Sequence, residues 1–94
     1  MTAPQWFDTL HDATLHAITF AWPTATVRLE LTRRTIVVEG VTSLVAPRTN
    51  AWGPSDSILE GELVVAGDVT TLTLHMQSGD DIEIVGRAAS IEPA

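Results

Sequence analysis

Residues 26–32, Thr-Val-Arg-Leu-Glu-Leu-Thr, alternate strictly between apolar and polar side chains. Val27, Leu29 and Leu31 fall on one side, and the arginine, the glutamate and the threonines fall on the other. Successive side chains of a β-strand point to opposite faces, so this period of two predicts a strand. Such a strand belongs to a sheet with one buried face and one face in water, which is typical of antiparallel sheets.

The preceding segment, Thr14 to Trp22, has the same period and predicts a partner strand. Its expected core face carries one histidine and three large apolar side chains, at His16, Ile18, Phe20 and Trp22. A loop from Pro23 to Thr26 pairs Trp22 with Val27, and proline suits the first corner of a type I turn. This register predicts that Trp22 belongs to the core.

The third segment, Thr35 to Val45, is apolar on both faces. Ile36 and Val38 continue the core face, and the opposite face carries Val37, Val41 and Val45. A strand of this kind is central or has a cover on its second face. The cover is the N-terminal segment with Trp6 and Phe7, a second sheet, or a second copy of the chain. The last alternative makes the protein a homodimer through the three valines.

Three further strands follow, at residues 57–65, at residues 69–77 and after a turn at Ser78–Asp80, and residues 87–92 add a short one around Ile91. In the strand of residues 57–65, the inward side chains are expected to be Leu59, Leu63 and Val65, with Glu60 and Glu62 outward. A three-residue loop pairs Met76 with Ile82 and places His75 opposite Glu83 on the wet face.

The whole chain, residues 1–94, therefore reads as one all-β domain of six to seven antiparallel strands in hairpin order. A strongly coiled sheet, an open barrel and a two-layer sandwich all satisfy the pattern. At most, a short helical turn is expected within Pro4–Ala13, because proline fits a first helical turn and the stretch is short.

The composition of the chain excludes several classes of function and partner. Twelve acidic residues face five arginines and no lysine, giving a formal charge of −7. Nucleic-acid binding leaves a basic footprint, so we expect no nucleic-acid partner. An acidic surface either serves solubility or attracts a basic protein.

The absence of cysteine excludes disulfides, zinc ribbons and thiol nucleophiles. No apolar stretch approaches the ~20 residues of a membrane span, and the N-terminus lacks a secretory signal, so a cytoplasmic protein without membrane contact is expected.

Three histidines and their neighbouring carboxylates raise a metal hypothesis, centred on His11, Asp12 and His16. A metal pair within one strand usually reads His-x-His, whereas His11 and His16 need a bend between them to converge. In the alternative, structural interpretation, His11 and Asp12 hydrogen-bond the backbone in a tight turn. No serine lies in a Gly-x-Ser-x-Gly motif and no glycine-rich loop would hold phosphate. We therefore assign no catalytic residue and no metal ligand, and expect no cofactor.

The longest irregular stretch contains Arg48, Asn50 and Trp52, followed by glycine and proline. Tryptophan and arginine are enriched in binding hot spots, and binding residues concentrate on loops. These three residues, with His11 and Asp12, are the candidate binding residues. The structural alternative is that Trp52 folds back and closes an open end of the core.

Three motifs carry a resemblance to known proteins: residues 10–18 with their His-Asp, the Trp-Gly-Pro-Ser of residues 52–55, and residues 76–83. Together they resemble a group of small, uncharacterised bacterial β-rich proteins. The opening His-Asp is also similar to immunity-protein-like domains of polymorphic toxin systems. The resemblance implies a cytoplasmic protein that masks a basic toxin domain by binding it. A non-catalytic protein-binding module is thus the expected function, and a metal-dependent enzyme using His11, Asp12 and His16 is the alternative.

Overall fold

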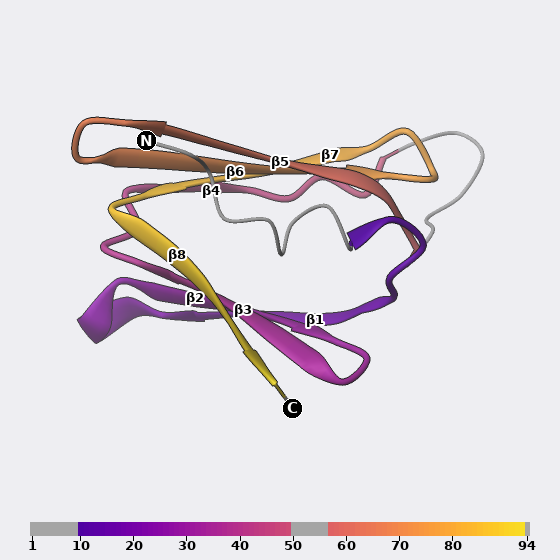
Figure 1. The fold of residues 1–94 in the computed structure, drawn as a ribbon, viewed down its shortest axis with the longest axis horizontal. Helices are drawn as coiled ribbons and strands as arrows, with labels where there is room; N and C mark the ends of the chain where they lie inside the picture. The colour runs from indigo at the N-terminus through magenta and orange to yellow at the C-terminus, as the bar shows by residue number, and fades with distance from the viewer. Residues whose placement is uncertain (1–9, 50–56, 94) are drawn as a thin grey trace.

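The computed structural model describes residues 10–49 and 57–93, which form two antiparallel sheets of four strands each. The first sheet has the order β1-β2-β3-β8 and the second the order β4-β7-β6-β5. Figure 1 shows them as two layers, with β8 leading from the end of β7 back to the first sheet. The strands are β1 Leu15–Ala21, β2 Thr26–Leu31, β3 Arg34–Glu39, β4 Ser43–Val45, β5 Ile58–Ala66, β6 Val69–Met76, β7 Asp81–Gly86 and β8 Ala88–Pro93.

The all-β, antiparallel prediction is confirmed, but the described strands number eight rather than six or seven. The extra strand arises because the segment Thr35–Val45 is broken at Gly40, which has a φ of +63°. A Cβ at this glycine would collide with the side chain of Arg87. The chain therefore leaves the first sheet after β3 and enters the second sheet as β4. Neither sheet closes or curls strongly, so the barrel and coiled-sheet alternatives were wrong.

The β1–β2 hairpin differs from its predicted register by two residues. Phe20, not Trp22, pairs with Val27, and Ile18 pairs with Leu29. Trp22 instead begins a 3₁₀ turn, Trp22–Thr24, and Ala25 closes it in the left-handed conformation. The side chain of Trp22 is 81% exposed, so its placement in the core was wrong. A two-residue slip keeps the period of two, so periodicity alone could not detect it.

Two β-bulges change which side chains face inward. The register of β1 shifts between Leu15 and Ala17, which leaves His16 as the extra residue, and Leu15 rather than His16 packs against the core. The register of β5 shifts between Ile58 and Glu60. As a result Ile58 is fully buried and Leu59 is exposed, so the prediction that Leu59 points inward was wrong. Of the other two side chains expected inside, Leu63 is buried as predicted and Val65 is exposed.

The two sheets bury one shared core between their facing surfaces. The fully buried side chains include Leu29 and Ile36 from the first sheet and Leu72, Leu74 and Ile84 from the second. Burial of a side chain of this size stabilises the fold by roughly 1.5–3 kcal/mol. Leu10 joins this core from the N-terminal side and is also fully buried. The predicted N-terminal turn, with Trp6 and Phe7, lies outside the described residues except at its end.

The three valines proposed as a dimer surface do not form one exposed stripe. Val41 is buried in the core cluster, and Val37 is buried on the outer side of the first sheet beside Arg28. The Arg28–Glu92 ion pair, 3.0 Å long, joins β2 to β8 across β3 on this side. Val45 is exposed, but it lies on β4 in the second sheet. The described residues contain no helix of the length and apolarity that crossing a membrane requires.

Candidate functional site

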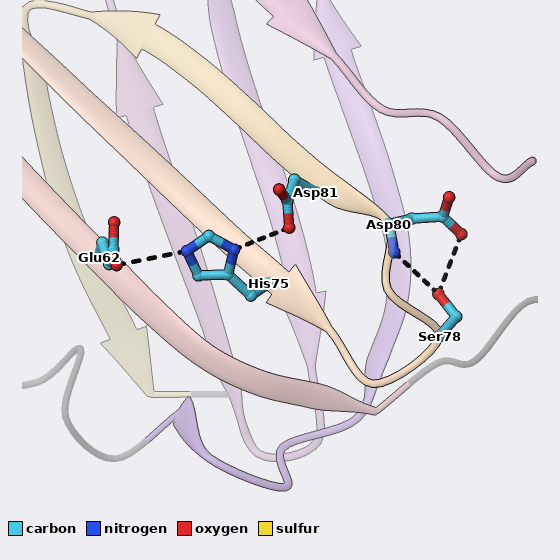
Figure 2. Close-up of polar contacts among 5 residues, drawn as sticks. All are labelled: Glu62, His75, Ser78, Asp80 and Asp81. Atoms are coloured by element: carbon cyan, nitrogen blue, oxygen red, sulfur yellow. Dashed lines mark hydrogen bonds and ion pairs between the residues drawn. The ribbon is translucent and has the colours of Figure 1, made fainter. Parts of the chain in front are cut away.

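The outer face of the second sheet brings a histidine and several carboxylates together. His75 lies on β6, and its Nδ1 is 2.7 Å from Oδ1 of Asp81 on the neighbouring β7. Its Nε2 is 3.4 Å from Oε1 of Glu62 on β5. Figure 2 shows the imidazole lying between these two carboxylates, which come from the strands on either side. His75 thus links three adjacent strands.

The turn between β6 and β7 sets this arrangement. The Oγ of Ser78 donates to Oδ2 of Asp80 at 2.9 Å and accepts from the Asp80 backbone N–H at 3.3 Å (Figure 2). The Met76 N–H donates to the Asp80 carbonyl, so the three-residue loop is residues 77–79, one residue earlier than predicted. His75 consequently pairs with Asp81, and Glu83 lies opposite Thr73. The expectation that His75 faces a carboxylate is correct in kind, but the named partner, Glu83, was wrong.

The protonation of His75 follows from its neighbours. Carboxylates only accept hydrogen bonds, so a histidine donates to both of them only when both ring nitrogens carry a proton. The hydrogen bond to Asp81 raises the pKa of His75 above its ordinary 6.5, and the charges of Asp81 and Glu62 act in the same direction against partial desolvation. The site therefore favours the imidazolium form.

Four carboxylates make this surface acidic: Glu60 and Glu62 on β5, and Asp81 and Glu83 on β7. We call these four residues the acidic face. The register places Glu62, Thr73 and Glu83 in one row across the sheet, and Glu60, His75 and Asp81 in the next. None of the five arginines of the chain lies within β4, β5, β6 or β7.

Exposed valines border the acidic face on both edge strands. Val45 on β4 pairs with Glu83 and so extends the row of Glu62, Thr73 and Glu83 to the edge strand. Its side chain is 53% exposed. Val64 on β5 is 59% exposed and lies beside Thr71, which pairs with Val85 on the other side. Acidic and apolar groups therefore share one solvent-facing surface, a combination that is common in protein interfaces.

Glu60, Glu62 and His75 also have the spacing of metal ligands, since one ligand atom from each lies within 4.8 Å of the others. A divalent cation and a proton on His75 would compete, because a metal binds a ring nitrogen that carries no proton and both would interact with Glu62. Sequence reasoning expected Glu60 and Glu62 on the outer face but did not connect them with His75. That connection depends on the pairing of β5 with β6, which the hairpin periodicity left open.

The structure places the candidate residues His11 and Asp12 in one local cluster and His16 in another. His11 hydrogen-bonds the Leu59 carbonyl through Nδ1, and its Nε2 lies 3.4 Å from Asp12. Asp12 has a φ of +65°, and it accepts a 2.6 Å hydrogen bond from the side chain of Gln77. The Asp12 N–H donates to the Ile58 carbonyl, so this pair joins the N-terminal segment to β5.

His16 lies apart from that pair. Its Nε2 is 2.7 Å from Oγ1 of Thr32 at the end of the β1–β2 hairpin. The described residues thus gather ligand-type side chains at His75, and not at His11, Asp12 and His16. Of the candidate loop, Arg48 is exposed, while Asn50 and Trp52 lie outside the described residues.

Comparison with known proteins shows the fold but no family. No protein-family model matches the chain, and no curated protein matches it in sequence. A crystal structure of an uncharacterized protein from Neisseria gonorrhoeae is similar over 89% of this chain and 93% of that one. Its TM-score is 0.73 at 19% sequence identity, so the two chains share their arrangement of strands.

Proposed function

We propose that this chain is a non-catalytic protein-binding module whose acidic face docks a basic protein. The observation that carries the proposal is the gathering of four carboxylates on two strands of one sheet face, with no arginine in any strand of that sheet. Such a one-signed surface steers a basic partner toward it and speeds the encounter.

The composition of the face supports a protein rather than a small cation as the occupant. Val45 and Val64 supply exposed apolar area on opposite edges, and Thr71 and Thr73 lie between them on β6. Apolar contacts of this kind stabilise an interface after electrostatic encounter, whereas a hydrated cation gains nothing from them. The resemblance to immunity-type domains makes a basic toxin domain encoded beside this gene the first partner to examine.

Two charge-matched variants test the proposal. In Glu62→Gln/Glu83→Gln the acidic face loses two charges, and in Glu30→Gln/Glu39→Gln the outer face of the first sheet loses two exposed charges. Partners captured from the native host would be identified, purified and titrated against all three proteins. We expect the first variant to weaken binding by about tenfold and the second by about twofold or less.

The salt dependence gives a second readout. Binding to the unaltered protein should weaken as salt rises, and the acidic-face variant should show a smaller dependence because it has fewer charges to screen. Equal losses in the two variants, or binding insensitive to salt, would rule out the acidic face as the docking surface. Circular dichroism and melting temperature confirm that both variants fold.

A further inference from the structure

A second candidate site lies between the sheets, away from the acidic face. A cleft of about 750 Å³ opens between the start of β1, residues 46–48 after β4, and the β6–β7 hairpin. Its volume falls in the range of ~300–1,000 Å³ that small-molecule sites occupy. Met76 and Ile82 line it from the inner face of the same hairpin whose outer face carries His75 and Asp81. The two sites thus use opposite faces of one hairpin.

One wall of the cleft is apolar. Leu15 and Ile18 of β1 are partly buried against the core, and Met76 and Ile82 are each 5% exposed. Leu15 and Ile18 therefore offer most of the exposed apolar area to an aliphatic group, and Met76 and Ile82 form the nearly buried floor behind them. Apolar area of this kind is the main source of affinity in small-ligand sites.

The rim of the cleft carries nitrogen donors. His16 is the extra residue of the β1 bulge, and bulges commonly redirect a side chain at a binding site. Arg48 also lines the cleft, and it makes no ion pair within residues 10–49 and 57–93.

Of the described residues that line the cleft, Asp80 is the one carboxylate, and it already accepts hydrogen bonds. Asp80 accepts from Ser78 Oγ through Oδ2 and from the Thr49 backbone N–H, at 3.4 Å, through Oδ1. Asp80 is therefore held by the turn, whereas the guanidinium of Arg48 has no ion pair among residues 10–49 and 57–93. A guanidinium binds a carboxylate through two parallel hydrogen bonds, which gives both affinity and orientation.

We propose that this cleft binds a small aliphatic carboxylate, with its tail on Leu15, Ile18, Met76 and Ile82 and its head on Arg48. His16 also lines the cleft; because its Nε2 is 2.7 Å from Thr32 Oγ1, its Nδ1 is the ring nitrogen that would donate a further hydrogen bond to the head group. The proposal goes beyond the docking function and stands without it, because no residue of the acidic face lines the cleft.

Sodium octanoate is the probe, and octylammonium and butyrate are its controls. Heteronuclear NMR titration should show saturable shifts at the cleft residues with octanoate. Octylammonium should bind at least about fivefold more weakly because its charge has the wrong sign for Arg48. Butyrate should bind at least about tenfold more weakly because it lacks four methylene groups that bury against the wall.

The variants Arg48→Gln and Arg87→Gln distinguish binding at the cleft from a general effect of net charge. Each removes one positive charge, and Arg87 lies in the β7–β8 turn rather than at the cleft. We expect about fivefold weaker octanoate binding in the first and no change in the second. The proposal is overturned by no saturable octanoate binding, by equal binding of octylammonium, or by an unchanged affinity in Arg48→Gln. None of these results bears on the acidic-face variants, so the two proposals fail separately.

Discussion

His75 and Asp81 face each other across the β6–β7 hairpin, with 2.7 Å between Nδ1 and Oδ1. Glu62 approaches the other ring nitrogen from β5 at 3.4 Å. A single histidine therefore joins two sequence-distant acidic strands, and its proton sets the net charge at the centre of the acidic face. Two predictions follow from this contact.

The first concerns the pKa of His75 itself. Asp81→Asn removes the carboxylate whose hydrogen bond contributes most to raising the pKa of His75, so this pKa should fall toward its ordinary value. Glu83→Gln is the matched control, because it removes one charge from the same strand at a residue paired with Thr73. NMR titration of the imidazole protons measures both variants. A larger effect of Glu83→Gln than of Asp81→Asn would contradict the observed register.

The second prediction concerns stability as a function of pH. A histidine whose folded pKa lies above its unfolded value stabilises the fold fully below the unfolded pKa, 6.5, and this stabilisation is lost as pH rises through the folded pKa. His75→Gln should therefore cost more stability at pH 6 than at pH 9. Because His75 is 28% exposed and Glu62 and Asp81 are 58% and 59% exposed, we expect a difference of at most about 1 kcal/mol.

Urea denaturation of the unaltered protein and of His75→Gln at pH 6 and pH 9 measures this difference. The other titrating groups contribute equally to the stability of both proteins, so their contributions cancel in the comparison. A cost that is larger at pH 9 would reverse the sign of the linkage and contradict the ion-paired imidazolium. The same proton partly neutralises the acidic face, so affinity for a basic partner should rise with pH over the same window.

Periodicity predicted the strands but not their exact pairing. The alternation of Val27, Leu29 and Leu31 identified β2 and its buried face, and all three side chains are buried. Trp22 and His75 were assigned wrong partners because each hairpin loop lies one residue earlier than expected, which shifts the strand register by two. A slip of two preserves the inward and outward faces, so only the loop geometry could have revealed it.

The bulges were the second source of error. His16 was expected on the core face and Leu59 inside, and each lies at a position where one residue is added to the strand. An added residue reverses the parity of everything on one side of it, and no local sequence pattern marks it reliably. The bulge at His16 also explains why this histidine, expected on the core face or as a metal ligand, instead lines the cleft.

A third prediction tests the observed register of β1 and β2, which leaves Trp22 outside the core. Trp22→Ala should destabilise the protein by less than about 1 kcal/mol, since the indole is 81% exposed and its described ring contact is with Phe20. Leu29→Ala, on the neighbouring strand, should cost about 2–5 kcal/mol because the side chain is fully buried. Thermal and urea unfolding compare the two variants. A cost for Trp22→Ala that approaches that of Leu29→Ala would restore the predicted pairing of Trp22 with Val27.

The fourth prediction concerns Gly86, where the second sheet approaches the first. A Cβ at this position would lie 2.7 Å from the carbonyl oxygen of Glu39 and 2.9 Å from Val38 Cγ1, so Gly86→Ala forces the backbone of β3 and β7 apart. We expect a loss of about 2–3 kcal/mol, as for other overpacked sites. Gly67→Ala is the control, because its Cβ would meet nothing within 4 Å and only its φ of +60° opposes the change, at about 1 kcal/mol. If Gly67→Ala proved the more damaging variant in urea unfolding, the close approach of the two sheets at Gly86 would be refuted.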